Sequence, residues 1–379
     1  MSESDIKGSN RRGVALQMAG VFIPVILLSL WGIITIFSAG AAEGPEKLVN
    51  KQAFWFCIAL AGFVAAYKTD LDFLKKLAIP IAVITIAMLV AVLIPGVGKT
   101  VKGSTRWIAF GSISVQPSDF AKISLVICLA AAIQYFQRDI KTFWKGTMPP
   151  IAITAMFVLP ILKEPDFGTS MLCVAVGGAV MFMAGIRLTH LFGFGLAGVS
   201  AIALMVLKNP NRLTRLASFL NREAEAQDGG YQLTQAIYAF GAGGVHGAGP
   251  GQGRQQYSFL PEAHTDFIFA NIAEEFGLIG TSLVLLLFFA IFASVFFSLK
   301  RARNLYEFSL CFGAVLMLTG QALFNMCVVV GLLPTKGISL PFMSYGGSNL
   351  VVMFAFTGII LNCLKRWSVP QKIKATDYE

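Results

Sequence analysis

Long apolar segments recur along this chain, and they constrain its fold more than any other feature. A helix needs about 20 predominantly apolar residues to cross the hydrocarbon core of a bilayer. Segments that reach or approach this length lie near 16–38, 52–67, 77–94, 117–135, 148–163, 168–186, 190–207, 267–299, 306–330 and 349–364. Only 13% of the residues are charged, which excludes an ordinary soluble domain. We therefore expect an all-α polytopic membrane protein with about ten spans.

Basic residues mark alternate connections between these segments. They include Lys7, Arg11, Arg12, Lys75, Lys76, Arg138, Lys141, Lys145, Lys300, Arg301, Arg303, Lys365, Arg366, Lys372 and Lys374. Short basic connections stay in the cytoplasm, and an even number of spans places both termini on the same side. We expect a single integral membrane domain over 1–379, with spans across about 16–364 and cytoplasmic tails at 1–15 and 365–379. Topology and anionic lipids account for the net charge of +10, so no nucleic-acid partner is required.

Residues that bind structural metals do not form a recognisable motif. The six cysteines lie in expected spans without CxxC spacing, and the three histidines are spread at His190, His246 and His264. Structural zinc sites use closely spaced Cys and His ligands. We therefore expect no metal site of this kind.

The longest connection, 208–265, is expected on the extracytoplasmic side and contains clustered glycines. Glycine alternates with other residues from Gly247 to Gly253. A phosphate-cradling loop of a nucleotide-binding protein would also need a following Lys-Ser/Thr and a strand-to-helix context, and both are missing. Two interpretations stay open, a mobile segment at the membrane surface and a backbone that closes over a lipid headgroup. Arg254 and the other arginines of this loop fit either.

Charged residues in or beside the spans indicate function more directly. They are Asp119, Lys122, Lys163, Glu164, Asp166, Asp266, Glu274 and Glu275. Because a charge costs roughly 3 kcal/mol at mid-bilayer, each must pair, lie at an interface or line a cavity. Asp119 and Lys122 share a helix face, and an internal ion pair and a cavity-lining substrate contact are equally supported. Glu274 and Glu275 are adjacent, so we expect one to face the bundle and the other an interface.

An acidic motif lies where the long connection re-enters the membrane. We expect Pro261 to begin a helix whose first turns hold Glu262 and Asp266 at i and i+4, on one face. The two carboxylates either complete the helix dipole at the membrane surface or provide a general base at an extracytoplasmic cavity. His264 points away from their face, so we do not assign it to a catalytic dyad.

Several short motifs are spread over most of the chain. They are LPEAHTDFIFA at 260–270, EEFG at 274–277, RWI at 106–108, QPSDFAK at 116–122, PDFGT at 165–169, YQ and QA at 231–236, and LPFMSYGGS at 340–348. Together they resemble the SEDS family of cell-wall polymerases, the shape, elongation, division and sporulation proteins. PTKG at 334–337 and EAH at 262–264 are more similar to the division branch, FtsW, than to the elongation branch, RodA.

The chain also departs from the pattern of the family it resembles. Asp119 stands where Glu is common, Glu164 where Gln is common, Ala242 where Ser is usual, and Gln256 where Lys is frequent. The first change keeps the charge but shortens its reach, which leaves open whether Asp119 still contacts Lys122. The last change removes one cation from the long connection.

The resemblance implies an enzyme that polymerises lipid II at the outer face of the bacterial cytoplasmic membrane, at the division septum. The 4-hydroxyl of an acceptor GlcNAc attacks C1 of an α-linked glycosyl pyrophosphate, and inversion gives a β-1,4 glycan strand. Asp266 matches the essential carboxylate of the family, and its expected position at the outer mouth of a span suits a general base.

Other residues are candidates for substrate binding and for shaping the site. Candidates for substrate contact are Arg106, Lys122, Arg254, Glu262 and Lys336, whose cations would stabilise the leaving pyrophosphate. No cofactor is evident, although a divalent cation such as Mg²⁺ is an alternative source of positive charge. Candidate structural or cavity-lining residues are Gln116, Asp119, Asp166, Ser344, Gly346 and Gly347. Gly346 and Gly347 are expected to shape a helix break near the cavity.

Other functions are compatible with the same charged residues. A lipid II flippase would also need a polar cavity within the membrane, although no internal repeat supports a transporter. A non-catalytic divisome scaffold would not need Asp266, and an elongation-type role is a further alternative. The resemblance implies as partners lipid II, the growing lipid-linked glycan strand, other divisome membrane proteins and a class B penicillin-binding protein, a transpeptidase whose single span packs against the bundle.

Overall fold

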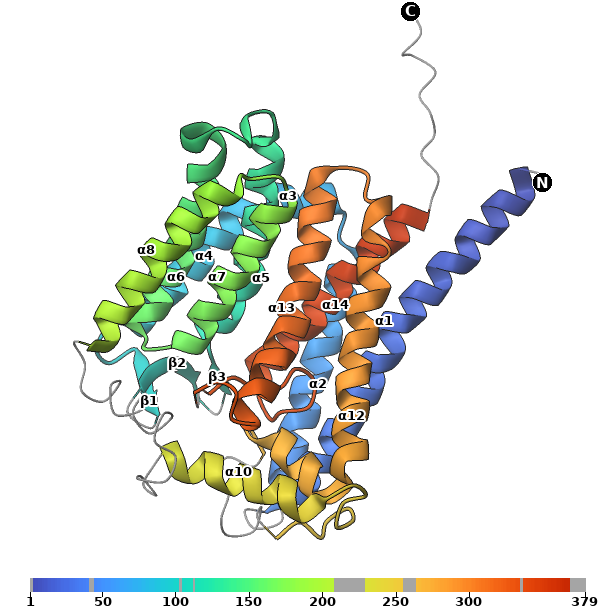
Figure 1. The fold of residues 1–379 in the computed structure, drawn as a ribbon, viewed down its shortest axis with the longest axis vertical. Coiled ribbons are helices and arrows are strands. Elements are labelled where there is room, and N and C mark those ends of the chain that lie inside the picture. The colour runs from blue at the N-terminus through green and yellow to red at the C-terminus, as the bar shows by residue number, and fades with distance from the viewer. Residues whose placement is uncertain are drawn as a thin grey trace, which may run out of the picture.

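Helices that run roughly along one direction dominate the computed structural model, which describes residues 3–40, 44–101, 104–111, 113–207, 229–254, 264–334 and 337–368 (Figure 1). A helix occupies each expected span. These helices are α1 (Glu3–Ala39), α2 (Pro45–Lys68), α4 (Ala78–Val92), α5 (Pro117–Tyr135), α6 (Met148–Lys163), α7 (Phe167–Met183), α8 (Leu188–Leu207), α12 (Ile268–Phe296), α13 (Leu305–Val329) and α14 (Gly347–Ser368). The predicted helical membrane fold is therefore confirmed.

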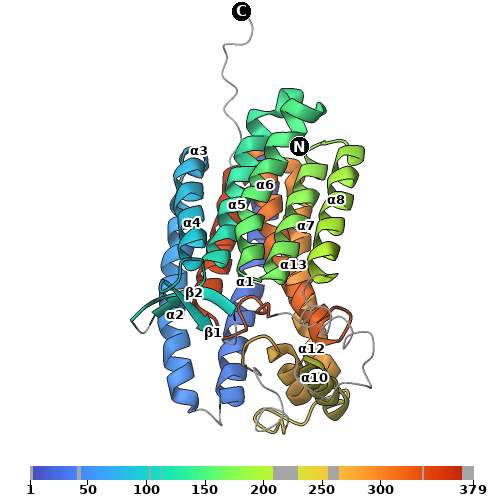
Figure 2. The same ribbon diagram turned by 90° about the vertical axis from the view of Figure 1, so that its left-hand side faces the viewer.

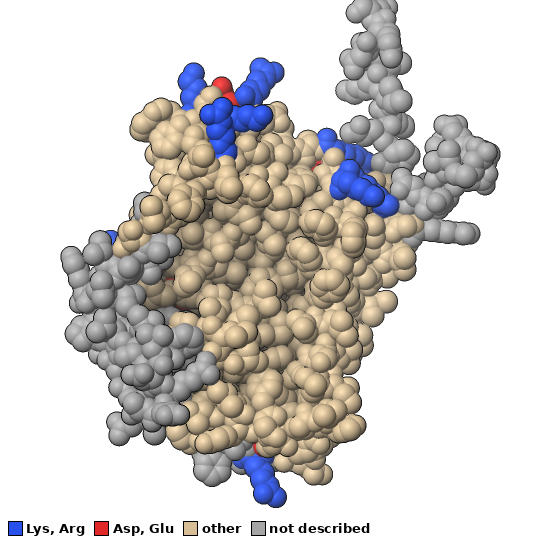
Figure 3. Space-filling view, viewed as in Figure 1, with Lys and Arg blue, Asp and Glu red and all other residues tan. Residues whose placement is uncertain are grey.

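Length and hydropathy identify membrane spans among these helices. Within the described residues, seven helices are long and apolar enough to cross a membrane, and α4 and α7 are apolar but shorter. The chain is therefore a multi-pass membrane protein, whereas the total of ten spans stays a prediction. On the face shown in Figure 3, lysines and arginines gather mainly at one end of the bundle, around the connection between α5 and α6 and near the last turn of α14. Their distribution agrees with the expected topology, although the cytoplasmic orientation of that end also stays a prediction.

Short elements close both ends of the bundle. Next to the basic residues lie α3 (Leu71–Lys76), the 3-10 turns η2 (Gln137–Asp139) and η4 (Leu299–Arg301), and the π-helical turn η3 (Phe143–Thr147). The opposite end carries α10 (Gly229–Gly243) and the strands β1 (Gly98–Val101), β2 (Ser104–Phe110) and β3 (Ile113–Val115). Figure 2 shows the sheet and α10 at the same end.

The small sheet is an element that hydropathy did not predict. Its order is β1-β2-β3, and both pairs of strands are antiparallel. Ile108 lies opposite Gly98 on β1 and Val115 on β3. The β-branched residues of this connection favour strands. Because they alternate with polar residues, the segment as a whole does not have the hydropathy of a membrane span. The sheet places Arg106 of β2 beside the connection between α6 and α7.

The core lies where α5, α13 and α14 pack together. Large buried side chains there include Leu125 and Leu129 of α5, and Phe354 and Phe356 of α14. The outer helices instead expose many Leu, Ile and Phe side chains, as expected for surfaces in contact with lipid. The most enclosed helices are therefore those that carry Asp119, Lys122 and their polar neighbours.

The helical backbone of α12 is interrupted at Gly277, and the glycine-rich connection supplies hydrogen-bond partners on both sides of the interruption. Gly277 has φ 63° and ψ −158°, a conformation essentially restricted to glycine. The segment 244–249 donates from its backbone to the carbonyls of Glu274 and Glu275, at 2.9 and 3.0 Å, and accepts from Leu278 and Ile279, at 2.9 and 3.2 Å. Backbone groups at membrane depth must find partners inside the protein. The segment 244–249 is thus a strap on α12, which neither interpretation of this loop anticipated.

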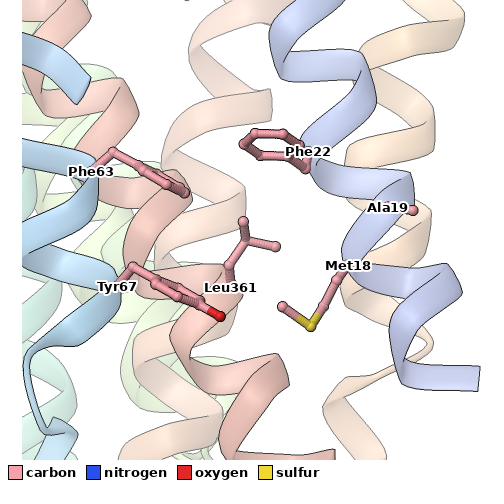
Figure 4. A pocket seen from close by; sticks show the side chains of 6 residues that line it. All are labelled: Met18, Ala19, Phe22, Phe63, Tyr67 and Leu361. Carbon is pink, nitrogen blue, oxygen red and sulfur yellow. The ribbon is translucent and has the colours of Figure 1, made fainter. Parts of the chain in front are cut away.

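An apolar groove lies on the lipid-facing side, between α1, α2 and α14 (Figure 4). It encloses about 310 Å³ and is lined by Met18, Ala19, Phe22, Phe63, Tyr67 and Leu361. Leu361 lies in the half of α14 far from its first residue, Gly347, where the polar site begins. The groove therefore contributes no side chain to that site, and its apolar wall suits the acyl chains of surrounding lipid.

Replacing Gly277 with alanine should destabilise the fold. Its φ is unfavourable for any residue with a Cβ, and a Cβ there would lie 2.5 Å from the backbone of Gly247 and Val245. We expect Gly277→Ala to lower the free energy of unfolding by about 1–3 kcal/mol. Gly178→Ala in α7 is the matched control, because a Cβ there meets nothing within 4 Å. Equal thermal stability of the two variants in detergent would contradict this role for Gly277.

Candidate active site

Asp266 lies in a turn immediately before α12, at the end of the bundle that carries the sheet. The described residues 264–267 form turns, and Phe267, with φ −105° and ψ 17°, precedes the first helical residue. The prediction that Asp266 lies within the first helical turns is therefore wrong, because the backbone at Phe267 is not helical. Glu262 and Pro261 lie outside the described residues, so the shared face of Glu262 and Asp266 stays a prediction.

The backbone around Asp266 is fixed by polar side chains from two other parts of the chain. Asn325 of α13 donates from Nδ2 to the carbonyl of Asp266 at 2.7 Å and to that of Ile338 at 2.6 Å. Ser344 donates from Oγ to the carbonyl of Thr265 at 2.7 Å. These contacts join the turn that carries Asp266 to the irregular segment 337–346, which precedes α14. The position of the Asp266 backbone is therefore set by α13 and by this segment.

The carboxylate of Asp266 faces the same irregular segment. A Cβ built on Gly337 would lie 2.8 Å from Asp266 Oδ2, so the absence of a side chain there leaves room beside the carboxylate. Lys336 precedes Gly337 and lies outside the described residues. The ring of His264 packs edge-on against Tyr345 at 5.8 Å between centroids, and burial raises the pKa of Tyr345. The side chain of Asp266 is half-buried, so part of it is accessible to solvent.

A buried ion pair lies at the start of α5. Lys122 Nζ is 2.8 Å from Asp119 Oδ1, so aspartate reaches the lysine despite its shorter side chain. The same Nζ donates to Gln321 Oε1 at 2.7 Å and to Asn349 Oδ1 at 3.0 Å. Lys122 is only 3% exposed, and an ammonium group has three protons to donate. Three described acceptors therefore satisfy Lys122, which favours the internal ion pair over the substrate contact.

Asp166 and Gln116 extend this polar network toward the sheet. Asp166 caps α7 by accepting from the backbone of Thr169 at 3.2 Å, and it also accepts from Gln116 Nε2 at 3.3 Å. The backbone of Gln116 donates to Ser348 Oγ at 3.3 Å, and Ser348 donates to Asp119 Oδ2 at 2.6 Å. The network thus runs without interruption from α7 through α5 to α14.

Arg106 braces the connection between α6 and α7. Its Nε donates to the carbonyl of Glu164 at 3.0 Å, and its Nη2 donates to the carbonyl of Pro165 at 2.6 Å. The guanidinium group is partly exposed. Arg106 therefore lies beside Asp166, on the rim of the network.

Both glutamates of the EEFG motif are buried, so the prediction that one of them faces an interface is wrong. Glu274 Oε1 accepts from the backbone of Arg254 at 2.7 Å, and Glu275 Oε1 accepts from the backbone of Gly251 at 3.1 Å. Ser38 of α1 also donates to Glu275. The backbone donors that follow the glycine-rich strap thus bind carboxylates of this chain. They leave the side chain of Arg254 exposed beside the strap.

Gly346 and Gly347 lie where the irregular segment ends and α14 begins. A Cβ on Gly347 would lie 2.0 Å from the ring of Trp55, so α2 and α14 approach closely there. Ser344 is buried, and its Oγ accepts from the backbone of Leu340 at 2.7 Å. These residues shape the backbone between α13 and α14 beside Asp266.

The structure also shows site residues that sequence reasoning missed. Gln321 and Asn325 lie four residues apart on α13 and therefore share a face. Gln321 Nε2 donates to the carbonyl of Ser339 at 2.8 Å, while Asn325 holds Ile338 and Asp266. The sequence signal for these two residues is a pair of amide side chains four residues apart within an otherwise apolar span. Among the described residues, no three His, Cys, Asp or Glu side chains converge as a metal site would require.

Comparisons with known proteins identify the family and several relatives of this chain. The family model of cell cycle proteins of the FtsW, RodA and SpoVE type matches residues 18–368. Probable peptidoglycan glycosyltransferase FtsW of Trichlorobacter lovleyi is 34% identical over 348 residues, which cover 90% of this chain and 91% of that protein. Stage V sporulation protein E of Bacillus subtilis is 36% identical over 348 residues, which cover 90% of this chain and 95% of that protein.

A solved structure shares the fold. It belongs to a study of how a peptidoglycan synthase complex coordinates polymerization and crosslinking. Its chain is 24% identical to this one, with a TM-score of 0.75, and the match covers 92% of this chain and 97% of that chain. With the family model matching nearly the whole length, the chain belongs to the FtsW/RodA/SpoVE family of cell cycle proteins.

Proposed function

We propose that this chain is a division-type peptidoglycan glycosyltransferase that polymerises lipid II into β-1,4 glycan strands. The observation that carries the proposal is the carboxylate of Asp266, which is half-buried beside the segment 337–346 while its backbone is fixed by Asn325. Similar members of the family are named probable peptidoglycan glycosyltransferases FtsW. Glycosyl transfer to a hydroxyl needs a general base, and a positioned carboxylate can serve as one.

Asp266 would act as a general base in a single displacement. Its carboxylate takes the proton from the 4-hydroxyl of the acceptor GlcNAc while that oxygen forms a bond to C1 of the donor. The bond between C1 and the pyrophosphate oxygen breaks, and its electron pair leaves with the undecaprenyl pyrophosphate. Attack opposite the leaving group inverts the α-linkage of the donor to a β-linkage in the product. Fixing the backbone of the base favours the geometry of proton transfer.

Positive charge is needed where the pyrophosphate leaves. Lys122 is the least available of the described candidates, because its three protons already have acceptors. Arg254 has an exposed side chain just after the strap, and Arg106 has a partly exposed guanidinium at the rim of the polar network. Lys336 lies outside the described residues and stays a candidate from the sequence. A divalent cation such as Mg²⁺ would serve the same purpose.

The partner that best fits this activity is a class B penicillin-binding protein. Glycan strands must be crosslinked after they form, and the solved neighbour is a peptidoglycan synthase complex that couples polymerization to crosslinking. The apolar outer helices offer surfaces on which a single span of a transpeptidase could pack. The enzyme would work at the septum in the bacterial cytoplasmic membrane, with both termini in the cytoplasm and the Asp266 end outside.

Replacing Asp266 with asparagine should abolish polymerisation while leaving the fold intact. Asparagine keeps the shape of the side chain but cannot accept the proton, so we expect the rate to fall by about 10²- to 10⁴-fold. The measurement is glycan formation from purified lipid II by the protein with its cognate transpeptidase, with that partner's own polymerising activity excluded. Asp139→Asn, an exposed aspartate at the opposite end of the bundle, is the matched control.

Two other outcomes of this assay would contradict the proposal. If Asp266→Asn polymerises normally, Asp266 is not the base. If neither the native protein nor the variant forms glycan under matched folded conditions, flipping of lipid II or a scaffolding role replaces polymerisation as the leading function.

A double-mutant cycle on Asp119 and Lys122 should separate a structural role from substrate binding. Lys122→Met leaves a buried carboxylate uncompensated, so we expect a loss of about 3–5 kcal/mol in the free energy of unfolding. Asp119→Asn combined with Lys122→Met removes both charges and should recover much of that loss. A structural pair predicts that the double variant also recovers polymerisation. A stable double variant without activity would instead assign a substrate contact to the Asp119–Lys122 pair.

A further inference from the structure

Glu164 is a buried acid that the proposed mechanism does not use. It follows the last residue of α6, its exposed fraction is 0%, and neither carboxyl oxygen has a hydrogen-bond partner among the described residues. An ionised carboxylate in such surroundings is strongly disfavoured, because nothing replaces the water that it loses. A protonated carboxyl group carries no net charge and tolerates the same position far better.

The charged neighbours of Glu164 do not supply a counter-ion. Asp166 lies two residues away and is negative, and it is held by Thr169, Gln116 and Ser118. Arg106 of β2 is the nearby cation, but its described hydrogen bonds go to the main-chain carbonyls of Glu164 and Pro165. Lys163 precedes Glu164 in the chain and is exposed.

Arg106 holds the connection between α6 and α7 with two hydrogen bonds from one guanidinium, to the main-chain carbonyls of Glu164 and Pro165. A negative charge on the adjacent Glu164 would compete for the same guanidinium, because charge-assisted hydrogen bonds to carboxylates are stronger than those to carbonyls.

We propose that Glu164 is a positioning residue that works as a neutral carboxylic acid, and that its ionisation draws Arg106 away from the connection between α6 and α7. Loss of the brace would disturb Asp166, which this connection presents to Gln116. Gln116 in turn contacts Ser348, the partner of the Asp119–Lys122 pair. Proton release from Glu164 thereby loosens the polar network beside the active site.

The direction of the pH dependence follows from the pKa of Glu164. Burial, together with the negative charge of Asp166, raises this pKa from 4.5 to about 8, and Arg106 opposes the rise. In the unfolded chain the carboxyl group ionises at its ordinary pKa, whereas the folded protein keeps it protonated. The stability contributed by the neutral form is therefore complete below about 4.5 and declines as the pH rises toward about 8. Glutamine has the shape of the neutral acid and does not ionise.

Thermal unfolding and polymerisation measured against pH test the proposal. We expect the native protein to lose stability as the pH rises toward 8, and Glu164→Gln to show a higher melting temperature and a flatter profile. We also expect native polymerisation to fall about tenfold per pH unit above the pKa, and Glu164→Gln to resist this fall. Glu46→Gln, an exposed glutamate at the start of α2, should follow the native protein in both measurements. Infrared spectroscopy of the native protein should show the carbonyl band of a protonated carboxyl group that disappears near pH 8.

Only the polymerisation measurement rests on the proposed function. The unfolding profiles and the infrared band test the protonation of Glu164 independently of it. Unfolding profiles that are the same for Glu164→Gln and the native protein would overturn the neutral acid, as would an infrared spectrum without the protonated band at neutral pH. An unchanged pH profile of polymerisation in Glu164→Gln would overturn the positioning role. Should neither protein polymerise lipid II, the infrared band and the unfolding profiles would still support or overturn the neutral acid.

Discussion

Polar groups within a membrane protein must find their partners inside the protein, and the rest of this structure depends on that constraint. Helix α12 breaks at Gly277, and the strap at 244–249 replaces the backbone partners that the break removes. Glu274 and Glu275 then hold the strap by accepting from its following backbone donors. The break, the strap and the two carboxylates form one unit directly behind the turn that carries Asp266.

The amides of α13 connect this unit to the second polar network. Asn325 holds the backbone on both sides of the Asp266 carboxylate, while Gln321 joins the irregular segment to the Asp119–Lys122 pair. Neither amide is charged, so each carries both donors and acceptors through the core without the desolvation cost of an ion. The position of the proposed base is therefore a property of the helix bundle and does not rest on a flexible loop alone.

The sequence allowed the helices to be predicted because membrane insertion depends on local hydropathy, and α5 and α6 coincide with the ranges expected for them. It also indicated that Asp266 lies at the end of a span, through a motif of adjacent residues, and the structure has it in the turn before α12. The sheet at 98–115 and the strap at 244–249 escaped prediction, because both depend on partners distant in the chain. Glu274 and Glu275 were misplaced for the same reason. Adjacent side chains on one helix point in different directions, so one of them was expected at an interface. Both are buried because the connection before α12 folds over them and donates hydrogen bonds to each.

A structure of this protein with a bound lipid II analogue would test the central claim most directly. The account predicts that the 4-hydroxyl of the acceptor GlcNAc lies about 2.6–3.2 Å from the Asp266 carboxylate, with the pyrophosphate of the donor on the opposite side of C1. Sugars bound away from Asp266, for example at the end of the bundle that carries α3, would contradict the assignment of the active site.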